Sequence, residues 1–513
     1  MPAPSRLQAA RHLESAPSPM KKDPDQKSTD KVARLRAKPM TKLPLGFCLF
    51  LILLLSAAPL PYQAKGQTKP TYRDKTPSDF ASQAREYMNA RARVTGFSGA
   101  VLVARKGRTV FRSGYGLANH EFGIPNTPTI KFRLASAGKQ FTAAAILLLE
   151  QRGKLKVADP VGAYLPNWPK AWEEVTIHNL LSHTAGLPRL TTQALMDVSA
   201  LTRSTVNPFR GVRDLLKPGE DLQPLDSKPG EKFAYSNVGY IVLSMIVEKA
   251  SGRSFCDFVS GEIFQPLGMI NTGCENPDMI LKQRANGYVR ISETLANAPY
   301  VDMRFANGGG SIYSTLDDLL LWDRALYSNR FLQADATERL FAPVRNEYAY
   351  GWWVQTKFNR KVEWHGGNVS GFVSQITRYP SEQLFIAVLS NVWSDADRSQ
   401  VRAISNELSA MALGEDYELP RKHKETKIGA AIYDAYAGEY SGKDKFAIAR
   451  EGDRLVVQIP PGQTVFEIVP ESTTQFFWKG REYYLTFVKD DNGKVTQVVI
   501  RNEGETGRWK KTR

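Results

Sequence analysis

Short segments in which hydrophobic and polar residues alternate begin at Phe97, and this alternation predicts β-strands. The first two, FSGAVLVARKG (97–107) and RTVFRSGYGLAN (108–119), meet at a Lys-Gly pair that is typical of a turn. The pattern then changes, because almost every residue from Phe141 to Leu149 is hydrophobic. A helix that is hydrophobic on all faces is buried. We therefore expect a core helix here, with Gly153 at its end.

Helical and strand patterns follow one another in the next part of the chain. Helices are predicted in TIHNLLSHT (176–184), VGYIVLSMIVEKASG (238–252) and STLDDLLLWDRAL (314–326). Strand patterns return in VEWHGGN (362–368), GFVSQITRYP (371–380) and LFIAVLSN (384–391), before a helix near Arg402–Leu413. This order predicts an α+β fold, with a mixed sheet built from two distant parts of the chain and the helices in a second lobe.

The N-terminal segment has the pattern of an export signal. Residues 1–42 are polar and basic without a hydrophobic period, and we expect them to be disordered. A hydrophobic run (43–55) and the small residues SAA (56–58) follow, as in a secretory signal. Because Met40 stands directly before this signal, we infer that translation starts there. The protein is expected to be exported, as a periplasmic or secreted protein; the alternative is an uncleaved anchor over residues 43–60.

The last part of the chain predicts a separate domain. Residues 415–427 (EDYELPRKHKETK) are charged and contain a proline, which is typical of a linker. Beyond them, short strand patterns recur at regular spacing, and Asn492-Gly493 is a strong hairpin signal. We expect a small all-β domain of barrel-like form. The chain is thus divided into a leader (1–66), a main domain (67–414), a linker (415–427) and an accessory all-β domain (428–513).

Composition and charge exclude several classes of protein. The 513 residues are 42% hydrophobic and 23% charged, which is typical of folded globular proteins. The net charge is +16, yet ten Lys/Arg and only four Asp/Glu lie in the first 42 residues, so part of the excess belongs to the leader. Apart from the tail GRWKKTR (507–513), no dense basic run is interleaved with aromatic residues, and we expect no nucleic-acid partner.

The three cysteines and six histidines form no metal-binding pattern. Neither HExxH nor CxxC occurs, and we expect neither a metal nor another cofactor. Cys48 lies in the hydrophobic N-terminal run, which leaves Cys256 and Cys274 in the folded part. These two could pair in an oxidising compartment or stay reduced, and their spacing does not decide between the two states.

Three separated stretches carry residues suited to acyl-transfer chemistry. In the first, Ser136 and Lys139 lie three residues apart, so on the first turn of a helix they share a face and the amine can reach the hydroxyl. Burial lowers the pKa of a lysine, which lets its neutral amine act as a base. The N-terminus of the helix also offers free N–H groups to a developing oxyanion.

The second stretch, FAYSNVGY (233–240), places Tyr235 and Asn237 in a loop before a helix. A tyrosine beside a lysine can relay protons, and an asparagine can bind a substrate amide; a loop that only caps the next helix is the alternative. The third stretch has His365 and Gly367 at the end of a strand, where glycine lets a substrate approach the strand edge. A simple turn is the alternative there.

Taken together and in this order, the three stretches resemble the motifs of the serine β-lactamase and penicillin-binding-protein superfamily. The surrounding sequence is similar to its class C β-lactamase-like branch, which includes esterases and D-aminopeptidases. The similarity runs from about Phe97 to Leu413 and includes VTIHNLLSHTAGLPR (175–189), IFQPLGM (263–269) and GGGSIYSTLDDLLLW (308–322). It implies the β-lactamase/transpeptidase-like fold and a covalent acyl-enzyme.

The resemblance also implies roles for individual residues. Ser136 would be the acylated nucleophile and Lys139 its hydrogen-bonded base or relay. Tyr235 would be the general acid and base that activates Ser136 and later a water. The oxyanion hole would consist of the backbone N–H groups of Ser136 and Asn368.

The residues implied to contact the substrate are Asn237, His365 and Gly367. In β-lactamases and carboxypeptidases the third motif normally begins with a lysine that helps to hold a carboxylate. Here it begins with a histidine, as in many esterase-like and aminopeptidase-like relatives. Because a histidine is at most partly charged at neutral pH, we expect weaker carboxylate binding and inefficient hydrolysis of β-lactams.

The sequence thus predicts an exported serine hydrolase that acts on an ester or on a D-amino-acid or peptide amide. Its partner would be a small-molecule or peptide substrate, with cell-wall fragments among the candidates, and contact with a membrane is expected only if the N-terminal segment stays uncleaved. The alternatives are a true β-lactamase and a non-catalytic protein of the same fold that binds the cell wall or a ligand. Loops such as Thr191–Ser227 would shape the pocket.

Three further features are interpreted as structural. His183 in LLSHTAGL is expected to be a residue at the end of a helix. The glycines 308–310 lack the Gly-Lys-Ser/Thr that follows in a phosphate-binding loop. Ser314 and Asp317 have the spacing of a capping box, and the pair Asp317-Asp318 is interpreted as part of a helix cap.

Overall fold

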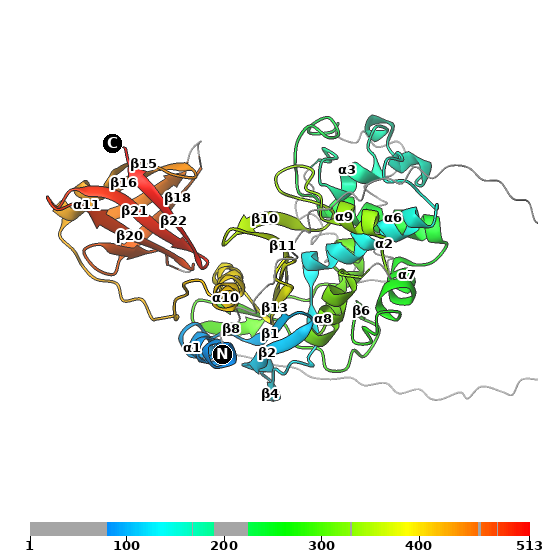
Figure 1. Ribbon diagram of the computed structural model, residues 1–513, viewed down its shortest axis with the longest axis horizontal. Helices are drawn as coiled ribbons and strands as arrows, with labels where there is room; N and C mark the ends of the chain where they lie inside the picture. The colour runs from blue at the N-terminus through cyan, green and yellow to red at the C-terminus, as the bar shows by residue number, and fades with distance from the viewer. Residues whose placement is uncertain are drawn as a thin grey trace, which may run out of the picture. The chain divides into compact units, whose positions relative to one another are not determined.

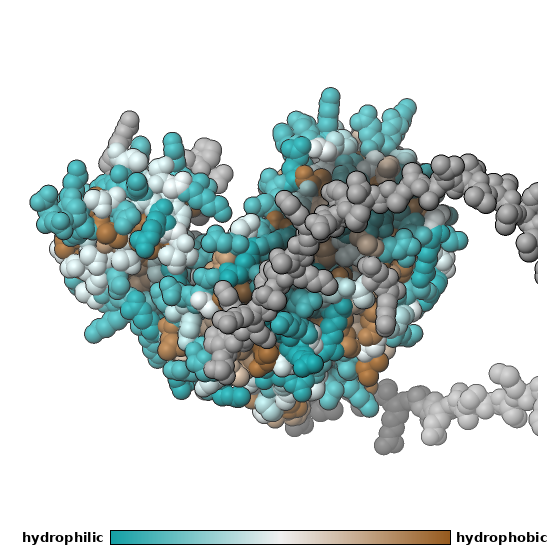
Figure 2. All heavy atoms as spheres, viewed as in Figure 1, coloured by the Kyte–Doolittle hydropathy of each residue, from teal (hydrophilic) through white to brown (hydrophobic). Residues whose placement is uncertain are grey.

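The computed structural model of the protein describes residues 79–166, 168–188, 224–328, 331–459, 463–479 and 481–512 (Figure 1). The predicted leader, with its signal run and Met40, lies outside these residues. Within the described ranges no helix is both long and apolar enough to cross a membrane. On the face shown in Figure 2, hydrophilic side chains cover most of the surface and hydrophobic ones gather only in small groups.

A six-stranded antiparallel sheet joins two distant parts of the chain, in the order β10-β11-β12-β13-β1-β2. Its strands are β1 (Gly99–Arg105), β2 (Arg108–Tyr115), β10 (Trp353–Lys357), β11 (Arg360–Val369), β12 (Phe372–Tyr379) and β13 (Leu384–Ser390). β1 pairs with β13 along its whole length, from Gly99 opposite Ser390 to Arg105 opposite Leu384. The predicted α+β fold, with a sheet assembled from distant segments, is confirmed.

Both faces of this sheet are covered, and β1 and β13 are therefore buried at every position. Val101 belongs to a hydrophobic cluster with α1 (Phe80–Thr95) and α10 (Asp395–Leu413) on one face. Its neighbour Leu102 belongs to the cluster of the helical lobe on the other face. Successive side chains of a strand point to opposite faces, so one strand supplies both cores. Helix α10 begins earlier than the predicted helix near Arg402.

The helical lobe is arranged around α2 (Lys139–Gln151), the predicted core helix. All but its last two residues are buried. The ring of Phe141 lies 5.2 Å from that of Phe264 and 4.8 Å from that of Trp322. The helix ends shortly before Gly153, whose φ of +68° is the left-handed conformation that favours glycine. The prediction of a helix buried on all faces is confirmed.

The domain contains further helices, single turns and small sheets. The helices are α3 (Ile177–Leu181), α6 (Asn237–Ser251), α7 (Phe255–Val259), α8 (Leu316–Ala325) and α9 (Ala334–Leu340), with the single turns η1 (Ala135–Gly138), η2 (Val161–Ala163), η3 (Lys170–Trp172), η4 (Ser260–Phe264), η5 (Met303–Phe305) and η6 (Asn307–Gly309). Three small sheets are formed by β3 (Leu117–Asn119) and β4 (Ile124–Pro125), by β5 (Phe132–Arg133), β9 (Ile312–Ser314) and β6 (Gly273–Cys274), and by β14 (Val392–Trp393), β7 (Tyr288–Ile291) and β8 (Thr294–Asn297).

The cap of helix α8 differs from the predicted one. Its N-cap is Thr315, whose hydroxyl accepts a hydrogen bond from the backbone N–H of Asp318. The prediction of a capping box from Ser314 and Asp317 is wrong, because Ser314 is the last residue of β9 and its hydroxyl pairs with that of Thr272. The carboxylate of Asp318 also accepts a hydrogen bond from Thr272, and so ties the helix start to the β6 segment.

The C-terminal part forms a closed antiparallel barrel of eight strands, as predicted for an all-β domain. Its elements are α11 (Ala430–Tyr436), β15 (Gly438–Ser441), β16 (Lys445–Glu451), β17 (Arg454–Ile459), β18 (Gln463–Pro470), β19 (Gln475–Phe477), β20 (Tyr483–Lys489), β21 (Val495–Asn502) and β22 (Glu505–Lys511). Aromatic side chains fill its core, where Tyr436 stacks on Phe487 with ring centroids 4.0 Å apart. The strand β22 contains most of the basic tail. The sequence did not predict this strand, because none of its residues is buried and they show no alternation of hydrophobic and polar residues.

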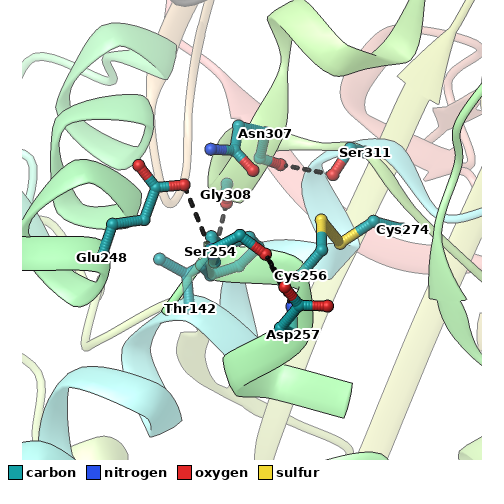
Figure 3. Close-up of a disulfide and its surroundings, with 10 residues drawn as sticks. Thr142, Glu248, Ser254, Cys256, Asp257, Cys274, Asn307, Gly308 and Ser311 are labelled. Atoms are coloured by element: carbon teal, nitrogen blue, oxygen red, sulfur yellow. Dashed lines mark hydrogen bonds between the residues drawn. A yellow bond between two sulfur atoms is a disulfide. The ribbon is translucent and has the colours of Figure 1, made fainter. Parts of the chain in front are cut away.

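Cys256 and Cys274 form a disulfide, with Cα atoms 5.8 Å apart. Figure 3 shows the bond beside the segment from Asn307 to Ser311. Cys256 belongs to α7, and Cys274 pairs with Ile312 of β9. The bond therefore links helix α7 to strand β6, which pairs with the strand that follows η6.

We expect the Cys256→Ser/Cys274→Ser double variant to unfold at a lower urea concentration than the wild type. The disulfide closes a loop with a sequence separation of 18 residues, and a loop of this length is worth about 3 kcal/mol in the chain-entropy account. Tryptophan fluorescence during urea unfolding measures the change. A reductant should lower the midpoint of urea unfolding of the wild type to that of the variant, and it should not change the midpoint of the variant. Equal midpoints for the oxidised and the reduced wild type would contradict the prediction.

Candidate active site

The nucleophile candidate Ser136 lies in the 3₁₀ turn η1, which leads directly into α2. The residue before it, Ala135, has a φ of +49°, a left-handed conformation that residues other than glycine seldom adopt. Strained backbone of this kind persists where the surrounding structure enforces it and is frequent at active sites. The turn is held from outside by a 2.8 Å hydrogen bond from Leu134 N to Ile312 O.

Lys139 is fully buried at the start of α2. Its amine donates hydrogen bonds to Ser136 Oγ at 3.0 Å, to Asn237 Oδ1 at 2.8 Å and to the carbonyl oxygen of Gly309 at 2.6 Å. Burial lowers the pKa of Lys139 to about 7, because the ammonium form loses its hydration. The charged and the neutral amine are therefore both well populated near pH 7, and the neutral form can accept a proton from Ser136.

No sequence signal points to the carbonyl of Gly309, which is part of the turn η6. A side chain on the preceding Gly308 would bring its Cβ within 2.8 Å of Ser244 Cβ and 2.9 Å of Tyr240 O, both in α6. Only glycine allows this close approach. The glycines 308–310, which do not match a phosphate-binding loop, thus let η6 pack against α6 with a carbonyl beside Lys139.

The loop before α6 is both a helix cap and part of the site. The Ser236 hydroxyl accepts a hydrogen bond from a backbone N–H one turn into the helix, so the capping interpretation of this loop is confirmed. The helix begins at Asn237, whose side chain carbonyl accepts the hydrogen bond from Lys139. The same helix start therefore fixes the asparagine against the buried amine.

Tyr235 lies beside this amine, with the Lys139 Nζ atom 5.1 Å from its ring centroid. Burial raises the pKa of Tyr235 above that of an ordinary tyrosine. A hydrogen bond with Ser136 lowers this pKa, but its effect is smaller than that of burial. Some 38% of the residue is nevertheless exposed, so solvent weakens the effect of burial. An unperturbed phenol is already neutral at pH 7. Tyr235 is therefore a neutral phenol in the resting protein.

Both ring nitrogens of His365, on β11, have partners. Nε2 accepts a hydrogen bond from the Tyr348 hydroxyl at 3.1 Å, and Nδ1 donates one to Gly366 O at 2.6 Å; these partners assign the neutral Nδ1–H tautomer. Burial, and then the charge of Lys139, lower the pKa of His365 to about 3. His365 is uncharged at neutral pH and cannot replace the positive charge of a lysine. The Gly366 carbonyl fixes the tautomer, because it can only accept a hydrogen bond; Tyr348 carries no motif in the sequence.

Gly367 lies directly against the nucleophile turn. A Cβ atom at this position would lie 2.1 Å from Leu134 O and 2.9 Å from Ala137 N, so no side chain fits. At the neighbouring Gly366, a Cβ would lie within 2.8 Å only of the flexible end of Gln375. The requirement for glycine at position 367 therefore comes from the approach of β11 to η1.

A pocket of about 270 Å³ opens over Ser136 and brings the sequence-predicted residues together. Tyr235, His365, Gly367 and Asn368 line it, and Lys139 and Asn237 join it through their hydrogen bonds. The other walls are formed by Gly366, which belongs to the third motif, and by residues that no motif indicates: Trp353, Trp364, Val373, Ser374, Gln375, Arg398, Val401 and Arg402. Most of the predicted pocket loop 191–227 lies outside the described residues.

The chain is similar in sequence to known proteins. Residues 84–410 match the beta-lactamase family. The chain is 31% identical over 434 residues to penicillin-binding protein 4* of Bacillus subtilis (strain 168), an alignment that covers 80% of this chain and 94% of that protein. It is 28% identical over 357 residues to a D-aminopeptidase of Gluconobacter oxydans (strain 621H), covering 68% of this chain and 65% of the relative.

The fold also has a counterpart among solved structures. The octameric penicillin-binding protein homologue from Pyrococcus abyssi superposes with a TM-score of 0.60 at 24% identity, covering 83% of this chain and 99% of that one. At this identity the likeness concerns the fold. The family match, by contrast, spans more than half of the 513 residues and includes every predicted site residue. The chain therefore belongs to the beta-lactamase family.

Proposed function

We propose that the protein is a serine hydrolase that acts through a covalent acyl-enzyme on an ester or on the amide of a D-amino acid or peptide. The observation that carries the proposal is the 3.0 Å hydrogen bond between the buried amine of Lys139 and the hydroxyl of Ser136, beneath an open pocket. Activation of a serine by an adjacent amine of lowered pKa is a known route to a nucleophile. Membership of the family supports the same type of chemistry.

In the proposed reaction, neutral Lys139 takes the hydroxyl proton of Ser136 while the serine oxygen attacks the substrate carbonyl. The backbone N–H groups of Ser136 and Asn368 stabilise the oxyanion. Tyr235, a neutral phenol, donates its proton to the leaving alcohol or amine and regains one from Lys139. The acyl group remains on Ser136, and a water molecule then releases it as the acid, with the proton transfers reversed.

The neutral state of His365 bears on the substrate. Carboxylate recognition at this position would need a charge that His365 lacks when its pKa is about 3. We therefore propose substrates whose reacting end is an ester or an amide without a free carboxylate at this position. The D-aminopeptidase relative supports the amide of a D-amino acid as one such substrate class.

Replacement of Ser136 by alanine should abolish covalent labelling by a fluorescent fluorophosphonate or penicillin probe. It should also lower kcat on p-nitrophenyl esters or D-alanine amides by at least about 1,000-fold, as is typical for loss of a nucleophile. Ser113→Ala, on β2 at the opposite edge of the sheet, is the matched control and should label like the wild type. A folded wild type that no acylating probe labels would refute the enzymatic proposal in favour of a binding protein. Fast turnover of nitrocefin would indicate a true β-lactamase.

The activity should rise with pH through about 7, the pKa of Lys139 in the folded protein. The sign follows from the proposed role, because only the neutral amine can take the proton of Ser136 and the neutral fraction grows above its pKa. The acidic limb of a kcat/KM profile on a non-ionising ester measures this pKa. The Lys139→Arg variant, whose side chain stays charged, should be inactive and should not show the acidic limb of the kcat/KM profile. An unchanged profile in this variant would exclude Lys139 as the base.

Gly367→Ala should lower kcat by about 100-fold or more, the size of effect seen when one oxyanion-hole donor is lost. The added Cβ cannot coexist with Leu134 O at 2.1 Å, so β11 must move away from the nucleophile turn. The matched control Gly366→Ala displaces only the end of the Gln375 side chain, and it should change kcat by less than about 10-fold. Equal effects of the two substitutions would speak against a special role of the contact between β11 and η1.

A further inference from the structure

His183 follows helix α3, yet its side chain does not face that helix. Its φ is +55°, and only 2% of the residue is exposed. The His183 carbonyl accepts a 2.8 Å hydrogen bond from Ala234 N, and its Nδ1 atom accepts one of 3.1 Å from Ser236 N. These two bonds bracket Tyr235 in the sequence, so His183 holds the loop on both sides of the tyrosine.

The His183 ring also packs against the Tyr235 ring, with centroids 4.2 Å apart and an interplanar angle of 40°. On its other sides it lies 4.7 Å from the ring of Tyr348 and 5.0 Å from that of Tyr240. Tyr348 is the residue whose hydroxyl binds His365. The ring thus fills the space between the second and third motifs of the site.

The protonation state of His183 follows from its partners. Nδ1 accepts a hydrogen bond, so Nε2 carries the proton, and this buried nitrogen has no partner among the described residues. Burial, and then the charges of Lys139 and His365, lower the pKa of His183 well below its usual value. A histidine needed only to end α3 would not require a buried ring with an acceptor aimed at another segment. The position instead requires a side chain with a hydrogen-bond acceptor for Ser236 N and a flat ring that packs against the neighbouring tyrosines. The residue must also tolerate a left-handed backbone conformation.

We infer that His183 is a positioning residue that fixes the phenol of Tyr235 over Ser136 by holding the backbone at Ala234 and Ser236. This inference rests on the proposed function, in which Tyr235 transfers the proton to the leaving group. His183 is not among the residues that line the pocket over Ser136. Its loss should therefore act through Tyr235, lowering kcat and sparing KM.

Two substitutions separate this role from simple packing. Asparagine offers an acceptor oxygen near the place of Nδ1 and tolerates a left-handed backbone, so His183→Asn should keep kcat within about 5-fold of the wild type. Leucine fills the space without an acceptor, so His183→Leu should lower kcat by about 100-fold, the lower range for loss of general acid–base catalysis, with KM changed less than about 3-fold. If His183→Leu does not fold, His183→Gly takes its place, because glycine adopts the left-handed backbone without strain.

The test is a double-mutant cycle with Tyr235→Phe, measured as kcat and KM on a p-nitrophenyl ester. If His183 acts through Tyr235, its replacement should lower kcat by less than about 3-fold in the Tyr235→Phe background, because groups that act as a unit are not additive. A reduction of the same size in both backgrounds, or a folded His183→Asn that loses as much as His183→Leu, would overturn the inference.

The failure of this inference is distinguishable from failure of the proposed function. Labelling of wild-type Ser136 by a fluorophosphonate probe reports on the nucleophile alone. A wild type that labels and turns over, combined with an additive cycle, would reject the role of His183 and leave the serine hydrolase proposal intact. A wild type without labelling or turnover would reject both.

Discussion

The amine of Lys139 is held in the core by three oxygen atoms from three separate segments: the nucleophile turn η1, the start of α6 and the turn η6. Burial of an ammonium group without hydrogen-bond partners would lower the stability of the fold by several kcal/mol. The three segments therefore have to pack so that each places an oxygen within hydrogen-bond distance of the amine. The same burial lowers the pKa of Lys139 to about 7. The burial of this amine thus constrains the packing of the helical lobe around α2 and gives Lys139 the pKa that the proposed role as a base requires.

The buried amine also limits the charge of its neighbours. The charge of Lys139 contributes to the lowered pKa of both His365 and His183, because a second cation close to the first is unfavourable in a site with little water. The tautomers of the two histidines are instead fixed by hydrogen bonds to the backbone, from His365 Nδ1 to Gly366 O and from Ser236 N to His183 Nδ1. Next to Lys139 both histidines are therefore neutral, whereas the charged side chains of Arg398 and Arg402 lie in the wall of the pocket. We therefore expect a bound carboxylate to be disfavoured at the position of His365 and not in the whole pocket.

The parts of this site that are local in sequence could be predicted, and those that depend on long-range backbone contacts could not. Ser136 and Lys139 meet because three residues separate them on one turn, a spacing visible in the sequence. The carbonyl of Gly309 has no side chain to mark it, and its contact spans 170 positions. The pairing of Cys256 with Cys274 depends on a Cα separation that only the fold sets.

The same distinction holds for the fold. The strands and the core helix were predictable because alternation and all-round hydrophobicity report burial directly. The N-cap of α8 is one residue later than predicted, because the hydroxyl of Ser314 forms a hydrogen bond with Thr272. This long-range contact cannot be predicted from the spacing of residues in the sequence. From its position in the sequence, His183 was predicted to be a residue at the end of a helix. The hydrogen-bond partner of its side chain, the backbone N–H of Ser236, lies 53 positions away and could not be predicted in this way.

Much of the geometry at the nucleophile comes from backbone rather than side chains. Leu134 O and Ala137 N face Gly367 so closely that no side chain can separate them, and Gly309 contributes a carbonyl to Lys139. Among the pocket walls, Ser374 belongs to this framework because its hydroxyl donates a hydrogen bond to Leu134 O. Trp353 and Trp364 instead stack on each other, with ring centroids 5.8 Å apart. Under the proposed function, we expect wall side chains such as these two tryptophans to select the substrate, while the backbone around Ser136 supports the proposed acyl transfer.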